Sequence, residues 1–173
     1  MSNQSDSYVV KASAHVGAVP KRVYAIIADY HNGHPRILPK EFTSLTVEQG
    51  GIGGGTVIRF TMRILGRRFA FRAVVTEPEP GRVLVEKNVG DNPSTTTFTV
   101  DRGSAPDEAV VMIATELPRK PGVLGALEQF LTRRTLHSIY ARELRLLEAV
   151  ARQPSVGQQG GSGPSPPSHD FAS

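Results

Sequence analysis

The feature that most constrains the fold is a long stretch of period-two hydrophobicity, from Phe42 to Leu117, that is followed by one long helical pattern. Apolar residues alternate with charged or small ones over 56–64 and again over 68–76, and Gly66 between them marks a tight turn. Successive side chains of a strand point to opposite faces of a sheet, so the alternation predicts strands with one apolar and one solvated face. The short connections favour hairpins and therefore an antiparallel sheet.

These patterns place strands along the chain and helices on both sides of the alternating stretch. We predict strands at 8–16, 43–48, 56–64, 68–76, 83–89, 95–100 and 109–117. Pro20 opens a first helix, a break follows at residues 31–35, and residues 37–39 form a second, short helical turn. From 122 to 151 the apolar residues are spaced three and four apart, which predicts an amphipathic helix of roughly 45 Å.

These elements predict an α+β helix-grip architecture. A sheet with one apolar face must bury that face, and only the C-terminal helix is long enough to cover it. We therefore expect a curved antiparallel sheet of about seven strands wrapped on the long C-terminal helix, with two short helices after the first strand. The sheet face that we expect to contact water carries the side chains of Arg59, Arg63, Arg68 and Arg72. A gap between the curved sheet and the helix would form a mostly apolar pocket.

Composition divides the chain and excludes several classes of protein. Thirteen of the 22 residues in 152–173 are Gly, Pro or Ser, which predicts a disordered tail; residues 1–7 are expected to be disordered, and 8–151 to form one domain. The chain has no Cys, which excludes a disulfide framework, a thiolate metal site and a catalytic thiol. It has no apolar run of about 20 residues and no signal-peptide pattern, so we expect a cytoplasmic protein.

Several segments resemble the START-like, Bet v 1-like helix-grip superfamily, specifically its polyketide cyclase/dehydrase and lipid-transport type (SRPBCC). They are VPKRVYAIIADYHNGHPRILP, GGIGGGTVIRF, TEPEPGRVLVEKN, TTTFTV and GALEQFLTRRTLHSIYARELRLLE, within residues 8–151. The family commonly has a Trp after the first helix, where this chain has His34-Pro35-Arg36. The resemblance implies a cavity for a lipid-like or polycyclic molecule, and it leaves catalysis open because the fold includes carriers, sensors and enzymes.

Polar residues near the predicted pocket are the candidate catalytic groups. Glu86 shares its strand parity with Leu84 and would be a carboxyl on the apolar face; otherwise it lies at a strand end in water. His31 and His34 follow the first helix, where they are either acid/base groups at the cavity mouth or ordinary polar residues of a loop. They lack further ligands for a metal site, and no cofactor motif is present: Gly50–Gly55 does not match a phosphate-binding loop.

The expected ligand contacts combine the apolar face of the sheet with the inner face of the helix. Tyr140 and Thr115 are polar anchors in this set, or a half-buried Tyr and its neighbour at the rim. The full set is Ile58, Phe60, Met62, Phe69, Phe71, Leu84, Glu86, Phe98, Val111, Ile113, Thr115, Leu127, Leu131 and Tyr140.

Binding of a small hydrophobic molecule, as a carrier or sensor, is the function that these residues favour. One alternative is a polyketide cyclase/aromatase-like enzyme that uses acid/base residues of the pocket; another is a non-catalytic interaction module. We expect ligand access through the loops around 31–39 and 50–55. Nucleic acid is not an expected partner because the strand aromatics point inward. We expect a monomer or weak dimer.

The net charge is confined to one part of the chain. Residues 119–152 contain seven Lys/Arg and three Glu, a balance of +4 that equals the formal net charge of the whole chain. This segment is the C-terminal helix and the turn before it. Its charged side is either a solvated outer face or a surface for peripheral contact with an anionic membrane.

Overall fold

The computed structural model describes residues 6–91 and 93–154; the segments 1–5 and 155–173, to which the prediction of disordered termini mainly applies, lie outside the described residues. The strands are β1 (Ser7–Val16), β2 (Phe42–Gln49), β3 (Val57–Ile64), β4 (Arg67–Glu79), β5 (Val83–Asn88), β6 (Thr95–Arg102) and β7 (Ala109–Pro118). The helices are α1 (Pro20–Ala28), the 3-10 helix η1 (His34–Arg36) and α2 (Gly122–Ala151).

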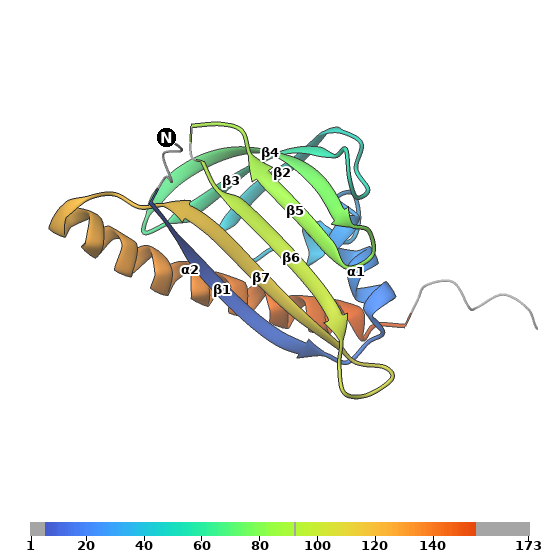
Figure 1. Cartoon of the computed structure of the whole chain (residues 1–173). Helices are drawn as coiled ribbons and strands as arrows, with labels where there is room; N and C mark the ends of the chain where they lie inside the picture. Colours follow the sequence, from blue (N-terminus) through green and yellow to red (C-terminus); the bar gives the residue numbers. More distant parts are fainter. Residues whose placement is uncertain (1–5, 92, 155–173) are drawn as a thin grey trace, which may run out of the picture.

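The strands form one antiparallel sheet in the order β1-β7-β6-β5-β4-β3-β2, and α2 crosses its concave side (Figure 1). The predicted α+β helix-grip fold is confirmed. The second short helical element lies three residues earlier than predicted. The His34 and Gly33 N–H groups both donate to the Asp29 carbonyl, and the Ile37 N–H donates to the His34 carbonyl, so the turn closes around His34.

The predicted separation of the two sheet faces is confirmed. In the register of β3 and β4, Phe60 pairs with Phe71 and Arg59 with Arg72. The arginines are exposed, whereas the apolar side chains on the opposite face of the two strands are buried or half-buried. On the outer face Glu48 of β2 binds both Arg59 and Arg72, at N–O distances of 2.8 and 2.7 Å, and so joins three adjacent strands.

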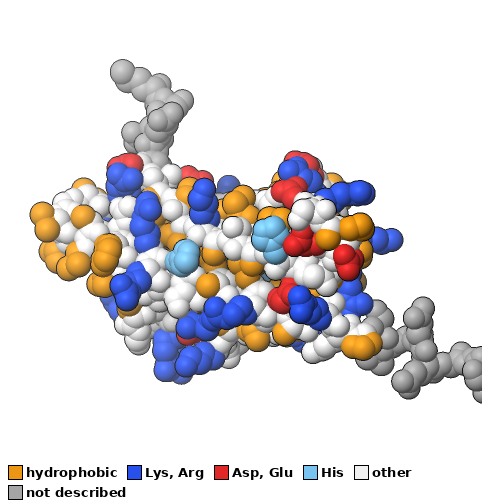
Figure 2. Space-filling view, turned by 90° about the horizontal axis from the view of Figure 1, so that it is seen from below, with side chains coloured by type: hydrophobic (Ala, Val, Ile, Leu, Met, Phe, Trp, Pro, Cys, Tyr) orange, Lys and Arg blue, Asp and Glu red, His pale blue; other side chains and the backbone are white. Residues whose placement is uncertain are grey.

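Only part of α2 packs against the sheet. Leu136, Ile139, Leu144 and Leu147 in its second half are buried. In its first half, apolar side chains are exposed, and Leu124 retains 84% of its accessible surface. Figure 1 shows α2 beginning beyond the edge of the sheet, and Figure 2 shows hydrophobic side chains gathered at that end of the molecule.

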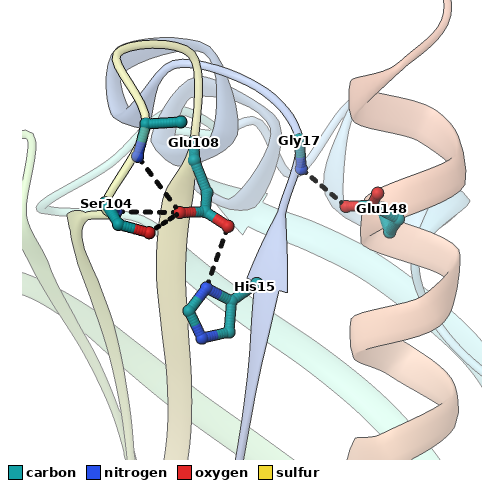
Figure 3. Close-up of polar contacts among 6 residues, drawn as sticks. His15, Gly17, Ser104, Glu108 and Glu148 are labelled. Atoms are coloured by element: carbon teal, nitrogen blue, oxygen red, sulfur yellow. Dashed lines mark hydrogen bonds and ion pairs between the residues drawn. The ribbon is translucent and has the colours of Figure 1, made fainter.

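The other end of α2 is tied to the turn that follows β1. Glu148 accepts a hydrogen bond from the Gly17 N–H at 2.9 Å (Figure 3). Nearby, Glu108 accepts bonds from the Ser104 N–H and hydroxyl and contacts His15 Nδ1 at 3.0 Å. The bonds from Ser104 lower the pKa of Glu108. These contacts hold the β6–β7 turn and β1 together, so they have a structural role.

Candidate ligand cavity

A cavity lies between the concave face of the sheet and the middle of α2. Its walls are mostly apolar; the lining residues are His34, Leu38, Phe42, Leu45, Ile58, Phe60, Met62, Glu86, Thr96, Phe98, Ile113, Tyr140 and Glu143. Its volume is about 40 Å³. This space accommodates a few water molecules, whereas pockets for drug-sized ligands measure roughly 300–1,000 Å³. A larger ligand therefore needs the walls to move apart.

One row of polar side chains runs across the concave face of the sheet, from the cavity into the core beside it. Cross-strand pairing places Glu86 on β5 beside Thr96 on β6, and Thr96 beside Thr115 on β7. The Thr96 and Thr115 hydroxyl oxygens are 2.8 Å apart, and Thr115 Oγ1 lies 2.6 Å from the Tyr140 hydroxyl of α2. Burial raises the pKa of Tyr140 well above its usual range, although the Thr115 bond opposes the shift. Tyr140 is therefore a neutral hydrogen-bonding group.

Glu86 is the centre of a second set of polar contacts. The Tyr30 hydroxyl donates to Glu86 Oε1 at 2.6 Å, and His34 Nε2 lies 3.8 Å from the same oxygen. Burial, followed by the nearby Glu86 charge, raises the pKa of Tyr30 well above 10. His34 Nδ1 lies 2.7 Å from the Ile27 carbonyl, which only accepts hydrogen bonds, so Nδ1 carries a proton and Nε2 faces Glu86. The Tyr30 hydroxyl is therefore a neutral donor to Glu86, and the three side chains form one polar cluster beside the cavity.

Glu143 is the second carboxyl that lines the cavity, and it lies one helical turn after Tyr140. It is 2% exposed. Among the described residues, no hydrogen-bond donor or ion-pair partner contacts its carboxyl group. Burial, and secondly the charge of Glu86, raises its pKa well above the ordinary value. Such an environment favours the protonated form of the acid, and a cation that lies beside it would favour the ionised form.

Half of the predicted ligand contacts line the cavity: Ile58, Phe60, Met62, Glu86, Phe98, Ile113 and Tyr140. Leu84, Val111 and Thr115 are buried in the same core but do not line it. Phe69 and Phe71 are half-buried on the apolar face of the sheet, outside the cavity lining. The Phe71 ring stacks on Phe60 with ring centroids 5.0 Å apart. Of the catalytic candidates, Glu86 and His34 share the cavity.

Leu127, Leu131 and His31 lie elsewhere. Leu127 and Leu131 are 55% and 39% exposed, because the first half of α2 extends past the sheet and has no surface to cover. His31 is exposed, and its Nε2 lies 3.3 Å from the Gly50 carbonyl oxygen. It therefore borders the glycine loop instead of the cavity.

The lining also includes five residues that the sequence patterns did not predict: Leu38, Phe42, Leu45, Thr96 and Glu143. A signal for Glu143 is present in the sequence. It follows Tyr140 by three residues and precedes Leu144 and Leu147, so it lies on the helix face that these buried residues share. The charge of a glutamate predicts instead that Glu143 lies on the solvated outer face of the helix.

The glycine loop of residues 50–55 does not line the cavity, because it is bonded to the end of α1. The Tyr30 N–H donates to the Gly51 carbonyl at 2.8 Å, and the Gly53 N–H donates to the Ala28 carbonyl at 2.9 Å. Gly51 has a φ of 128°, and a Cβ there would lie 1.9 Å from His31 Nε2, so only glycine fits. Within the described ranges, no three His, Cys, Asp or Glu side chains gather to hold a metal ion.

Comparison with known proteins gives a family and a fold. The family model described as "Polyketide cyclase / dehydrase and lipid transport" matches residues 8–152, and no curated protein matches the chain. The solution structure of the KanY protein has a TM-score of 0.75 and 23% identity, over 86% of this chain and 99% of that chain. The Zhui aromatase/cyclase from a Streptomyces strain has a TM-score of 0.70 and 12% identity, over 88% and 99%. A START superfamily protein from Mycobacterium smegmatis has a TM-score of 0.64 and 18% identity, over 83% of this chain and 96% of that chain. At these identities the structural likeness establishes the fold alone.

Proposed function

The chain belongs to the polyketide cyclase/dehydrase and lipid transport family, and from this premise we propose that it binds a small hydrophobic molecule, lipid-like or polycyclic, as a carrier or sensor. The observation that carries the proposal is an apolar cavity between sheet and helix whose polar groups are gathered on one row and one helix face. Such a cavity removes the apolar part of a ligand from water and orients it through a few polar contacts.

The ligand must enlarge a cavity of about 40 Å³, and the rim formed by Leu38, Phe42 and Leu45 is the wall best placed to move. This segment is held to α2 by the ion pair of Glu41 with Arg142, at 2.6 Å. Glu41 Oε2 and Arg142 Nε are buried there without hydrogen-bond partners, so part of the gain from the pair is offset. We place ligand access at this rim, because the glycine loop is fixed by its bonds to α1.

A second candidate function is catalysis of the aromatase/cyclase type. It is favoured by two carboxyl groups in one cavity: Glu86 with Tyr30 and His34 beside it, and Glu143 with no partner among the described residues. Groups held in such different environments are suited to separate acid and base roles. Turnover would then require a substrate carbonyl or enol within hydrogen-bond distance of these groups.

Native mass spectrometry of the protein purified from its own host tests the binding proposal. We expect a co-purifying small molecule that is released on denaturation. Thr96→Leu should fill the cavity and remove this adduct, whereas the control Thr97→Leu, at the neighbouring position of opposite strand parity, should retain it. If no adduct is found, and no member of a lipid and polyketide panel raises the melting temperature, the binding proposal is wrong and the interaction-module alternative is favoured.

We also propose that a membrane surface is a peripheral partner. Exposed Leu124, Leu127 and Phe130 lie between two basic pairs, Arg119-Lys120 and Arg133-Arg134, on the first half of α2. Apolar side chains flanked by basic ones favour insertion at an anionic lipid interface. No helix in the described part of the chain is long and apolar enough to cross a bilayer.

A further inference from the structure

We propose that the cavity selects ligands that carry a protonated amine, and that Glu143 is the group that binds the ammonium. This inference rests on the proposed function and names the chemical class of the ligand. It is drawn from the side chains that line the cavity.

The first observation is the position of Glu143. Its side chain lies in the wall of the cavity with 2% exposure, and no donor or cation among the described residues satisfies it. Buried polar groups in proteins are nearly always hydrogen-bonded, and an unpaired carboxyl is among the costliest exceptions. A partner that arrives with the ligand would remove this cost.

The second observation is the charge balance of the lining. Glu86 and Glu143 both line the cavity, and no Lys or Arg of the described residues does. In the part of the chain that the structure describes, His34 is the only basic side chain in the lining, and it faces Glu86 at 3.8 Å and not Glu143. An incoming ammonium would therefore be attracted by the Glu86 charge and would favour ionisation of Glu143, whereas an incoming carboxylate would be repelled.

The third observation is the aromatic wall. Phe42 and Phe60 lie with ring centroids 5.7 Å apart, and Phe98 also lines the cavity. These faces accept an apolar ring and also attract cations through the ring quadrupole. The cavity thus matches an amphiphilic ligand with an aromatic body and an ammonium end.

Binding of an ammonium is linked to a proton. The titratable groups around Glu143 are Glu86 on β5, His34 on η1, Tyr30 after α1 and Tyr140 on its own helix. Without ligand, burial and the Glu86 charge raise the pKa of Glu143 and so favour its protonated form. Since the ammonium favours the ionised form, binding releases this proton, and affinity for the amine must rise with pH while the amine stays protonated.

A matched series of probes tests the inference: naphthylethylamine, naphthylethanol and naphthylacetate. The chain has no Trp, so naphthyl emission and anisotropy report binding with little background. We expect the amine to bind about tenfold or more tightly than the alcohol, and the acetate to bind most weakly. Glu143→Gln should reduce the ratio of amine to alcohol to about one. Glu128→Gln, the same change at an exposed position of α2, should leave the ratio unchanged.

Proton release supplies a readout on the unmodified protein. Titration calorimetry of the amine in two buffers of different ionisation enthalpy should show a proton released, and the affinity should rise as the pH increases above the ordinary carboxyl value of about 4.5. Equal or tighter binding of the alcohol would overturn the amine inference while the proposed function stands. If none of the three probes binds, the amine inference is wrong, and the binding proposal is decided separately by the co-purification and melting-temperature measurements.

Discussion

At the scale of single residues, the unusual group is Glu143. Its carboxyl is buried and has no partner among the residues that the structure describes, and its pKa is raised by burial and by the Glu86 charge. The folded protein therefore retains a proton that the unfolded chain releases above the ordinary value of about 4.5. Stability contributed by this proton is fully present below that value and is lost as the pH rises through the folded pKa.

Glu143→Gln should make the free energy of unfolding less dependent on pH. In the unmodified protein we expect this free energy to fall above pH 4.5, by at most about 1.4 kcal/mol per pH unit from this group. The amide carries no charge, so the free energy of unfolding of the variant should lose this part of its pH dependence. At the highest pH values measured, the variant should be more stable than the unmodified protein. Urea unfolding at successive pH values measures the slope. The exposed control Glu128→Gln should retain it, and an unchanged slope in Glu143→Gln would contradict the buried, protonated carboxyl.

At the scale of elements, the two halves of α2 have different surroundings. Its second half carries the buried residues that close the sheet and cavity, and its first half extends past the sheet with exposed apolar residues. The hydrophobic spacing is the same along both halves, so the sequence does not distinguish them. What distinguishes them is the surface that each half faces.

Leu147→Ala and Leu124→Ala apply the same change to the two halves. Leu147 is 2% exposed and Leu124 is 84% exposed. We expect Leu147→Ala to lower the free energy of unfolding by about 2–5 kcal/mol, because it leaves a cavity in the core. Leu124→Ala should change it by no more than about 0.5 kcal/mol. Equal losses in urea unfolding would show that the first half of α2 is also packed.

At the scale of the whole molecule, charge and apolar surface coincide on the first half of α2. The chain outside residues 119–152 has balanced charge, with 13 basic and 13 acidic residues. The exposed leucines and Phe130 add apolar surface where the positive charge is highest. This combination is the basis of the proposed membrane contact.

Liposome co-sedimentation measures the membrane contact. We expect binding to vesicles that contain anionic lipid, weak binding to neutral vesicles, and loss of binding at high salt, because screening shortens the reach of the basic residues. A variant that carries Leu124→Gln and Phe130→Gln should bind several-fold less. Leu146→Gln, at a 37% exposed position in the second half, is the control. Binding that ignores both lipid charge and salt would refute the contact.

Much of the fold was predictable because its signals are local. The alternation in 56–64 and 68–76 predicted the faces of β3 and β4, and Gly66, with a φ of 77°, forms the turn where the sequence placed it. Glu86 and His34 were found because each is a polar residue at an apolar or loop position. The second helical turn was misplaced by three residues because it depends on bonds to the Asp29 carbonyl, which a hydrophobic pattern does not report.

The sequence by itself determined the strands, the hairpin order, the long helix and the family, because periodicity and turn residues act over about ten positions and are readable without knowing what lies opposite. Only the tertiary structure decided where α2 crosses the sheet. That crossing exposes Leu127 and Leu131, buries Glu143 beside Glu86, and leaves a small cavity between them. These outcomes depend on contacts between residues far apart in the chain, and such contacts are fixed by how the sheet curves around the helix, not by any local pattern.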